Sequence, residues 1–214
     1  MDAENLFSCI DSLPSEHQKW ISHWGRGPRV PVPHSTVHGA FESIADIHPL
    51  VVAARHEERS ITYRELDVRA NRLANHLIEL GLRPRQRVCL VVHRSLEMLI
   101  GIFAILKAGC QYVPIDGGVA SKEAMPHILS DTEAHFILCL ERFQDLVNCF
   151  RGGDTTLVLL GKDVDAFCST ERARIEVASG DGVYAIYTSG SLKLGAWIWH
   201  CAHNTQEVLA VQKA

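Results

Sequence analysis

Residues 87–116 read RVCLVVHRSLEMLIGIFAILKAGCQYVPID, and this stretch decides the fold. The apolar run 87–92 predicts a compact buried strand, and 112–115 (YVPI) predicts a second one. Between them, 95–109 predicts a helix that is apolar on nearly every side, with Ser95 as its N-cap and Gly109 at its end. Because such a helix must be buried on more than one face, the stretch predicts a strand, helix, strand unit inside a larger core.

The flanking sequence continues the same alternation. Residues 50–54 and 61–63 predict a small hairpin, and the apolar stripe from 63 to 78 predicts an amphipathic helix that Gly81 ends. Downstream we expect helices at 124–130 and 141–149, strands at 136–140, 156–160 and 183–187, and a polar connection at 161–182. Alternation at this period predicts an α/β fold with a mostly parallel sheet and helices on both faces.

Composition limits the class of protein. The 214 residues are 47% hydrophobic and carry a formal net charge of -4, without a basic block. Nucleic acid and anionic membrane surfaces are therefore not expected partners. No apolar run reaches the length of a membrane span, and the acidic start MDAENLFSCI does not resemble a signal peptide, so we expect a cytoplasmic protein. Seven scattered cysteines without a C-x-x-C pair predict reduced thiols that serve as small core residues.

Histidines are numerous, and two groups have spacings that a metal site could use. His34 and His38 have i, i+4 spacing, but prolines and Gly39 surround them, so we expect exposed loop histidines. The segment 199–203 (WHCAH) resembles a ligand cluster, but it has no distant second pair. We therefore expect no metal site.

The segment 184–191 (YAIYTSGS) predicts a ligand-binding loop. An apolar strand, 183–187, leads into Thr188, Ser189, Gly190 and Ser191, which form a turn rich in hydroxyls and backbone N–H groups. Such turns hold polyphosphates, and the predicted sheet would deliver this one to its carboxyl edge, where α/β proteins bind ligands. The residues that follow lack the further glycines of a phosphate loop, and Lys193 stands at an unusual spacing.

Other polar residues are interpreted structurally. Lys107 is expected to close its helix as a cation near the C-terminal dipole, and Asp116 to form a turn at the end of its strand. Ser189 lacks the flanks of a hydrolase nucleophile, and Tyr184 and Tyr187 are interpreted as strand aromatics. No catalytic residue is assigned.

Three ordered motifs carry a family resemblance. The segments 61–81 (ITYRELDVRANRLANHLIELG), 106–116 (LKAGCQYVPID) and 184–191 (YAIYTSGS) together resemble the N-terminal part of adenylate-forming enzymes. The likeness is greatest to amino-acid adenylation domains of nonribosomal peptide synthetases, and the lead-in 19–49 resembles that of fungal synthetase-like proteins. It implies a partial N-terminal domain of that fold, covering roughly residues 20–191.

The resemblance implies a two-step reaction. With ATP and Mg, an amino or aryl acid becomes an acyl-adenylate, which a phosphopantetheine thiol on a carrier then accepts. By the same resemblance, Thr188, Ser189, Gly190 and Ser191 would bind the β- and γ-phosphates, and they are the only site residues assigned. The other two motifs in this family mostly build the sheet and its helices.

The chain departs from the family after Ser191. The expected Thr-Gly and Pro-Lys-Gly are missing, the family's remaining contacts lie farther along a longer chain, and the tryptophan-rich tail suggests a frame change, retained intron or premature stop. We therefore expect an arm or linker at 1–39, a truncated AMP-binding domain at 40–191 and a divergent tail at 192–214, without adenylation by this chain alone. The alternative is a non-catalytic interaction module that docks on a full-length synthetase, with self-association through an exposed sheet face. A phosphate-binding enzyme of another class would leave the two upstream motifs unexplained.

Overall fold

The computed structural model describes residues 12–24, 33–120, 124–161, 164, 166–167, 169–178, 180–187, 196–199 and 209–212. The chain divides into two units, Met1–Val32 and Pro33–Ala214. The first contains helix α2 (Ser15–Trp24), which exposes Trp20 and Ile21. Among the helices that the structure describes, none combines the length and the apolar character needed to cross a lipid bilayer.

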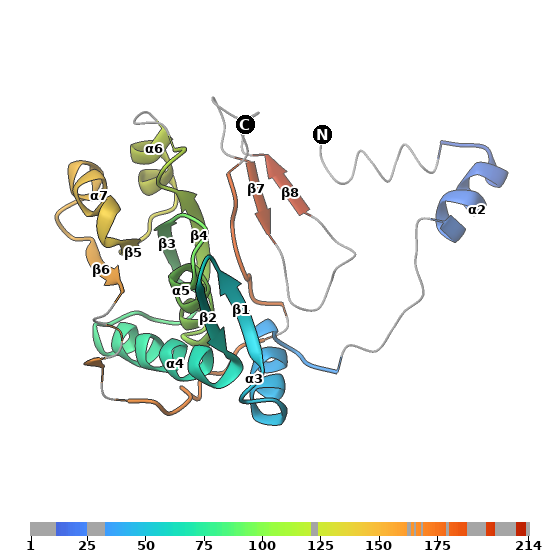
Figure 1. The fold of residues 1–214 in the computed structure, drawn as a ribbon. Coiled ribbons are helices and arrows are strands. Elements are labelled where there is room, and N and C mark those ends of the chain that lie inside the picture. The colour runs from blue at the N-terminus through green and yellow to red at the C-terminus, as the bar shows by residue number, and fades with distance from the viewer. Residues whose placement is uncertain are drawn as a thin grey trace. The chain divides into compact units, whose positions relative to one another are not determined.

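The second unit is built on a four-stranded parallel sheet (Figure 1). Its strands, in the order β4-β3-β5-β6, are β4 (Gln111–Asp116), β3 (Arg87–Val92), β5 (Phe136–Leu140) and β6 (Thr156–Leu160). In register, Val88 of β3 lies between Tyr112 of β4 and Phe136 of β5. The parallel sheet expected from the sequence is therefore confirmed.

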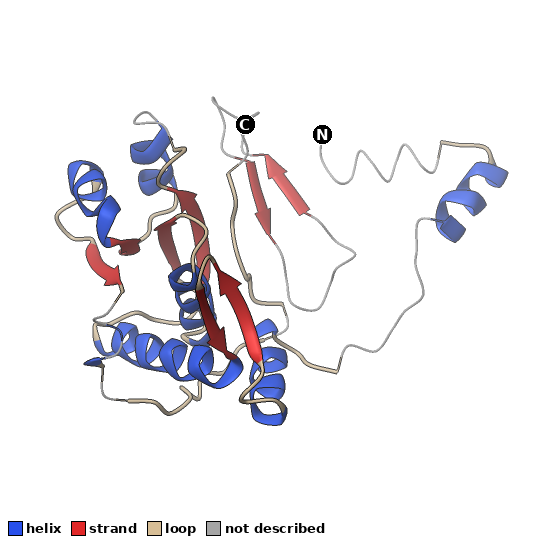
Figure 2. Cartoon of the chain, viewed as in Figure 1, coloured by secondary structure: helices blue, strands red, loops and turns tan. Residues whose placement is uncertain are grey.

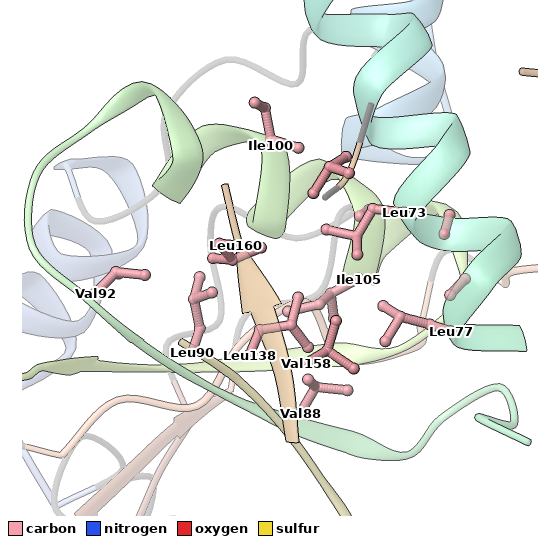
Figure 3. Packing of buried hydrophobic residues seen from close by; sticks show 14 of the residues in the cluster. Leu73, Leu77, Val88, Leu90, Val92, Ile100, Ile105, Leu138, Val158 and Leu160 are labelled. Carbon is pink, nitrogen blue, oxygen red and sulfur yellow. The ribbon is translucent and has the colours of Figure 1, made fainter. Parts of the chain in front are cut away.

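Helices cover both faces of this sheet (Figure 2). On one face lie α4 (Tyr63–Glu79) and α5 (Leu96–Lys107), and on the other lie α6 (Ala124–Asp131) and α7 (Gln144–Phe150), which follows the short 3₁₀ helix η1 (Glu141–Phe143). Successive side chains of β3 point to opposite faces of the sheet. Val88 and Leu90 lie in the α4–α5 core, whereas Cys89 and Val91 lie in the α6–α7 core. Figure 3 shows the first core, where Leu73, Leu77 and Ile105 pack over Leu138 and Val158.

Local signals explain where these helices begin and end. Ser95 caps α5 by accepting a hydrogen bond from the Met98 amide at 3.1 Å. Gly109 follows α5 with a φ of +72°, a conformation that glycine adopts without strain, and the Cys110 amide bonds back to the Ile105 carbonyl at 3.0 Å. The predicted ends of this helix are therefore close to the observed ones.

A hairpin and a further helix lie beside α4. Strands β1 (Val52–His56) and β2 (Arg59–Thr62) form the expected antiparallel hairpin. Helix α3 (Val37–Ile47) was not expected, because the prolines and glycine around it predicted irregular chain; the Thr36 side chain caps it. His38 therefore lies in the first turn of a helix and is half-buried, and our prediction of an exposed loop histidine was wrong.

The tail contains a separate antiparallel pair, β7 (Ala196–Trp199) and β8 (Leu209–Gln212). The sequence did not predict this pair.

Three of the four cysteines that the structure describes fit the predicted role of small core residues. Cys89, Cys110 and Cys139 are free and buried, whereas Cys149 is free and exposed. Burial raises the pKa of Cys89 to about 11, that of Cys110 to about 12 and that of Cys139 to about 11. These three thiols therefore stay protonated at neutral pH and act as small apolar side chains.

The α4–α5 core predicts a large loss of stability on truncation. Leu138→Ala removes a fully buried side chain, so the free energy of unfolding should fall by about 3 kcal/mol, from lost transfer energy plus a residual cavity. Urea unfolding followed by circular dichroism measures this change. The matched control is Leu80→Ala, whose side chain is 45% exposed and whose replacement should cost less than about 0.5 kcal/mol. Equal losses in the two variants would contradict this assignment of the core.

Candidate functional site at the carboxyl edge of the sheet

The strand order places the topological switch point of the sheet at the carboxyl ends of β3 and β5. These adjacent strands are followed by helices on opposite faces, α5 after β3 and α7 after β5. Open α/β sheets bind ligands at such a point, because the two connections diverge there. His93, which follows β3, and Phe143, which follows β5, meet there edge to face with ring centroids 6.0 Å apart.

Hydrogen bonds hold the end of β4 next to the end of β3. The Gly117 amide donates to the Val92 carbonyl at 3.1 Å, and Asp116 accepts a hydrogen bond from the Gly118 amide at 2.9 Å. A Cβ on Gly117 would lie 2.7 Å from the Phe143 ring, so glycine lets that ring close over the strand end. The prediction that Asp116 forms a turn is confirmed.

The segment that leads to the predicted phosphate loop runs parallel to β4. The Tyr112 amide donates to the Val183 carbonyl at 3.2 Å, and the Ala185 amide donates to the Tyr112 carbonyl at 3.1 Å. The next donor on β4 in this ladder is Pro114, which has no N–H, so the pairing is limited to one bridge. The chain thus reaches the carboxyl edge at Tyr187 without forming a full fifth strand.

A side chain holds the end of this segment. The Tyr187 hydroxyl donates to Asp131 Oδ2 at 2.6 Å, which ties the residue before the loop to the last residue of α6. Burial, followed by the hydrogen bond to Asp131, raises the pKa of Tyr187. The phenol therefore remains a donor throughout the physiological range. The sequence indicated only a strand aromatic here, because the partner lies 56 positions away.

The start of the segment is held by an ion pair. Arg85 Nε lies 2.9 Å from Asp181 Oδ1, and Asp181 also accepts from the Ala178 amide. The hydrogen bond from Arg85 lowers the pKa of Asp181. Next to it, a Cβ on Gly182 would lie 2.8 Å from the Gln111 side chain, so this position lies close against β4.

The predicted loop residues themselves, Thr188, Ser189, Gly190 and Ser191, lie outside the described residues, as do Lys193 and the cluster of His200, Cys201 and His203. Their assignments stay predictions. Within the part of the chain that the structure describes, no group of three or more His, Cys, Asp or Glu side chains could hold a metal ion.

A buried charge cluster lies at the C-terminal end of α5. Lys107, the last residue of α5, is 2% exposed; its Nζ lies 2.8 Å from Asp67 of α4 and also bonds to Glu42 of α3. The prediction that Lys107 ends its helix is confirmed, but two carboxylates neutralise its charge, and the sequence did not indicate them.

The connection after β6 joins this cluster through Arg172. Its guanidinium binds Asp46 with two hydrogen bonds, at 2.8 and 2.9 Å, and lies 3.0 Å from Asp67. The hydrogen bond from Arg172 lowers the pKa of Asp46, and the same bond raises that of Arg172. Asn71 and Asn75 of α4 add hydrogen bonds to backbone carbonyls of the connection. Residues 170–172 of the polar connection are therefore bound along α4.

An open parallel sheet whose connections diverge at its carboxyl edge is typical of ligand-binding α/β enzymes. Residues 41–191 match the family profile "AMP-binding enzyme", and the chain belongs to this family. The expected partial N-terminal domain of an adenylate-forming enzyme is thereby confirmed.

Relatives of two kinds share this region. The chain is 37% identical over 188 residues to adenylate-forming reductase 06235 of Coprinopsis cinerea, covering 85% of this chain and 18% of that protein. It is 38% identical over 162 residues to phosphinothricin tripeptide synthetase PhsC of Streptomyces viridochromogenes, covering 74% of this chain and 14% of that protein. The chain thus spans less than a fifth of either relative.

Solved structures agree on the fold. The nonribosomal peptide synthetase FmoA3, crystallised with AMPPNP, superposes with a TM-score of 0.74 at 26% identity, over 86% of this chain and 19% of that one. The N-terminal domain of FACL13 from Mycobacterium tuberculosis superposes with a TM-score of 0.69 at 21% identity, over 78% of this chain and 44% of that one. The second likeness supports the fold alone.

The charge cluster predicts strong coupling between Lys107 and Asp67. Lys107→Met leaves Asp67 and Glu42 with less neutralising charge, so unfolding free energy should fall by about 3 kcal/mol. In Lys107→Met/Asp67→Asn one of these charges is gone, and the double variant should cost less than the two single changes added together. Urea unfolding of all four proteins gives the coupling energy. Simple additivity would show that the pair does not interact.

The Tyr187 hydrogen bond predicts local protection of the segment before the loop. Tyr187→Phe removes the donor to Asp131, so the Ala185 amide should exchange with solvent about tenfold faster, while the exchange of β3 amides stays unchanged. Hydrogen exchange followed by NMR measures both. Tyr63→Phe, a change of the same atoms on α4, is the control. If the Ala185 amide exchanges at the same rate in the two variants, the Tyr187 hydroxyl does not hold this segment.

Proposed function

We propose that this chain supplies the phosphate-binding part of an adenylating enzyme of the nonribosomal peptide synthetase type. The observation that carries the proposal is the family match over residues 41–191, which ends on the segment that Tyr187 and Asp181 fasten beside β4. We assign ATP phosphate binding to Thr188, Ser189, Gly190 and Ser191. Their hydroxyl and backbone N–H groups are suitable donors for phosphate oxygens.

The proposed reaction activates the carboxylate of an amino or aryl acid. A carboxylate oxygen attacks the α-phosphorus of ATP, the bond from that phosphorus to the bridging oxygen breaks, and pyrophosphate leaves. A phosphopantetheine thiol of a carrier then attacks the acyl carbon and releases AMP. Mg bound to the phosphates would offset their negative charge, and no residue of this chain is assigned as a Mg ligand.

This chain's own residues would contribute position and electrostatic stabilisation. Donors placed before the reaction stabilise phosphate charge at low reorganisation cost, provided that the loop starts from a fixed point. The Tyr187–Asp131 hydrogen bond supports such a point one residue before Thr188. We further infer that residues 40–191 are the adenylation part, preceded by an arm at 1–39 and followed by a divergent tail, and that further segments are needed to complete the reaction.

A chimaera tests this function. Residues 41–191 of this chain replace the matching segment of adenylate-forming reductase 06235, and acid-dependent exchange of labelled pyrophosphate into ATP is measured. The chimaera should catalyse exchange, and Thr188→Ala/Ser189→Ala within it should lower the rate about 100-fold, the usual effect of removing a preorganised donor. Ser130→Ala, an exposed serine on α6, is the matched control. A folded chimaera whose exchange rate ignores the double substitution would contradict the assignment.

A non-catalytic interaction module is the second candidate, and one observation favours it. Large apolar side chains are exposed close together in sequence, from the end of α3 into β1: Ile44, Ile47, Leu50, Val51 and Val52 are 38–79% exposed. Exposed apolar patches often mark association surfaces. Sedimentation of the 214-residue chain with and without a full-length synthetase separates the candidates. A monomer at all concentrations that does not co-sediment would exclude the module.

A further inference from the structure

A pocket of about 390 Å³ lies at the amino edge of the parallel sheet, opposite to the carboxyl edge. Its lining includes residues at the start of three strands: Arg87 begins β3, Gln111 begins β4, and His135 directly precedes β5. Glu133 and Gly182 also line it. Because parallel strands all begin at the same edge, these residues come together although they lie far apart in the sequence. We call this feature the amino-edge pocket.

The carboxamide of Gln111 is a buried polar group without a partner. The residue is 5% exposed, and its side chain makes no hydrogen bond within the described residues. Its polar atoms are not among the unpaired side-chain atoms that are closed off from solvent, so they are reached through the pocket. A Cβ on Gly182 would lie 2.8 Å from Gln111 Cδ and 2.9 Å from its Nε2, so this glycine leaves room for the carboxamide. A free donor and a free acceptor are thus held side by side in the pocket wall.

The charged groups at the pocket do not favour an anionic ligand. Arg85 is paired with Asp181 at 2.9 Å, and Arg87 donates to the Thr132 carbonyl at 3.1 Å, so both cations already have partners. The Glu133 side chain is exposed and forms no hydrogen bond or ion pair within the described residues. A carboxylate repels a phosphate but accepts hydrogen bonds from hydroxyl groups. The pocket therefore suits a neutral ligand that carries hydroxyls.

His135 adds a planar ring to the same pocket. It is exposed, and its side chain makes no ring contact or hydrogen bond within the part of the chain that the structure describes. Imidazole rings stack on unpaired nucleobases. A glutamine carboxamide pairs with adenine through two hydrogen bonds, donating to ring nitrogen 7 and accepting from the 6-amino group. The pocket thus contains the two kinds of group that recognise the edge and the face of an adenine ring.

We propose that the amino-edge pocket binds a purine nucleoside, with an adenine base paired to Gln111. Gln111 Nε2 would donate to ring nitrogen 7, and its Oε1 would accept from the 6-amino group. His135 would cover one face of the ring, and Glu133 would accept a hydrogen bond from a ribose hydroxyl. The volume of about 390 Å³ is within the usual range for small-molecule sites. The site uses no phosphate and none of the residues assigned to the phosphate loop, so it is independent of the proposed adenylation chemistry.

A nucleoside titration tests the proposal on the 214-residue chain. The probe is adenosine, and its Kd is measured by NMR from shifts of the Gln111 and Gly182 amides in the ¹⁵N-labelled protein. Gln111→Leu removes the base pair and should weaken binding at least about fivefold. Because the carboxamide has no partner in the described fold, this variant should resist urea at least as well as the unchanged protein, whereas a structural role would lower its stability. The matched control, Gln144→Leu on α7, lies outside the pocket and should leave Kd within about twofold.

Further probes separate base recognition from binding at the proposed phosphate loop. 7-Deazaadenosine lacks the ring acceptor and should bind about fivefold more weakly than adenosine, while AMP should bind no more tightly. Gly182→Ala places a Cβ against the carboxamide and should weaken adenosine binding as Gln111→Leu does, whereas Thr188→Ala/Ser189→Ala should leave Kd unchanged.

Four results would overturn the proposal. They are no binding at about 10 mM adenosine, equal affinity for adenosine and 7-deazaadenosine, an unchanged Kd in a folded Gln111→Leu protein, or a loss of binding in the Thr188→Ala/Ser189→Ala variant.

Discussion

The need to neutralise one buried lysine constrains how α3, α4 and α5 pack together. Lys107 ends a helix that is apolar on nearly every side, and an ammonium group in such surroundings is costly unless carboxylates reach it. Asp67 and Glu42 supply them from α4 and α3, and Arg172 balances the excess negative charge from the connection after β6. Four segments far apart in the sequence are thus held at one point, and the connection to the loop is one of them.

The sheet guides the segment before the proposed phosphate loop by a different constraint. Residues 183–185 follow β4 in parallel, but Pro114 removes the donor that would extend the ladder. Proline is tolerated here because β4 bonds to β3 through its other residues, so the missing N–H falls on the outer edge. Backbone pairing therefore guides the segment only as far as Ala185, and side chains must hold the remainder.

The sequence predicted the elements whose signals are local. Alternation along 87–116, the Ser95 cap and Gly109 gave β3, α5 and β4 almost to the residue, because period and capping depend on neighbours only a few positions away. It did not predict α3, since prolines and a glycine outweighed the Thr36 cap, nor the partners of Lys107 and Tyr187. Those contacts join residues 40 to 65 positions apart, and a single sequence contains no signal for such pairs. The phosphate loop was inferred from hydroxyl chemistry and family resemblance, which require no knowledge of these contacts.

Two side-chain contacts hold the segment 181–187, which precedes the proposed phosphate loop, and salt and pH affect them differently. The Arg85–Asp181 pair holds its start, and because the Arg85 side chain is 68% exposed, this attraction is weakened by salt. The Tyr187–Asp131 hydrogen bond holds its end, with a phenol that burial keeps protonated, so neither salt nor pH near neutrality removes its donor. Phosphate donors are useful only when they are placed to within a fraction of an ångström. The less screened of the two contacts lies at the residue directly before the proposed phosphate donors, where an error in position would act on them most directly.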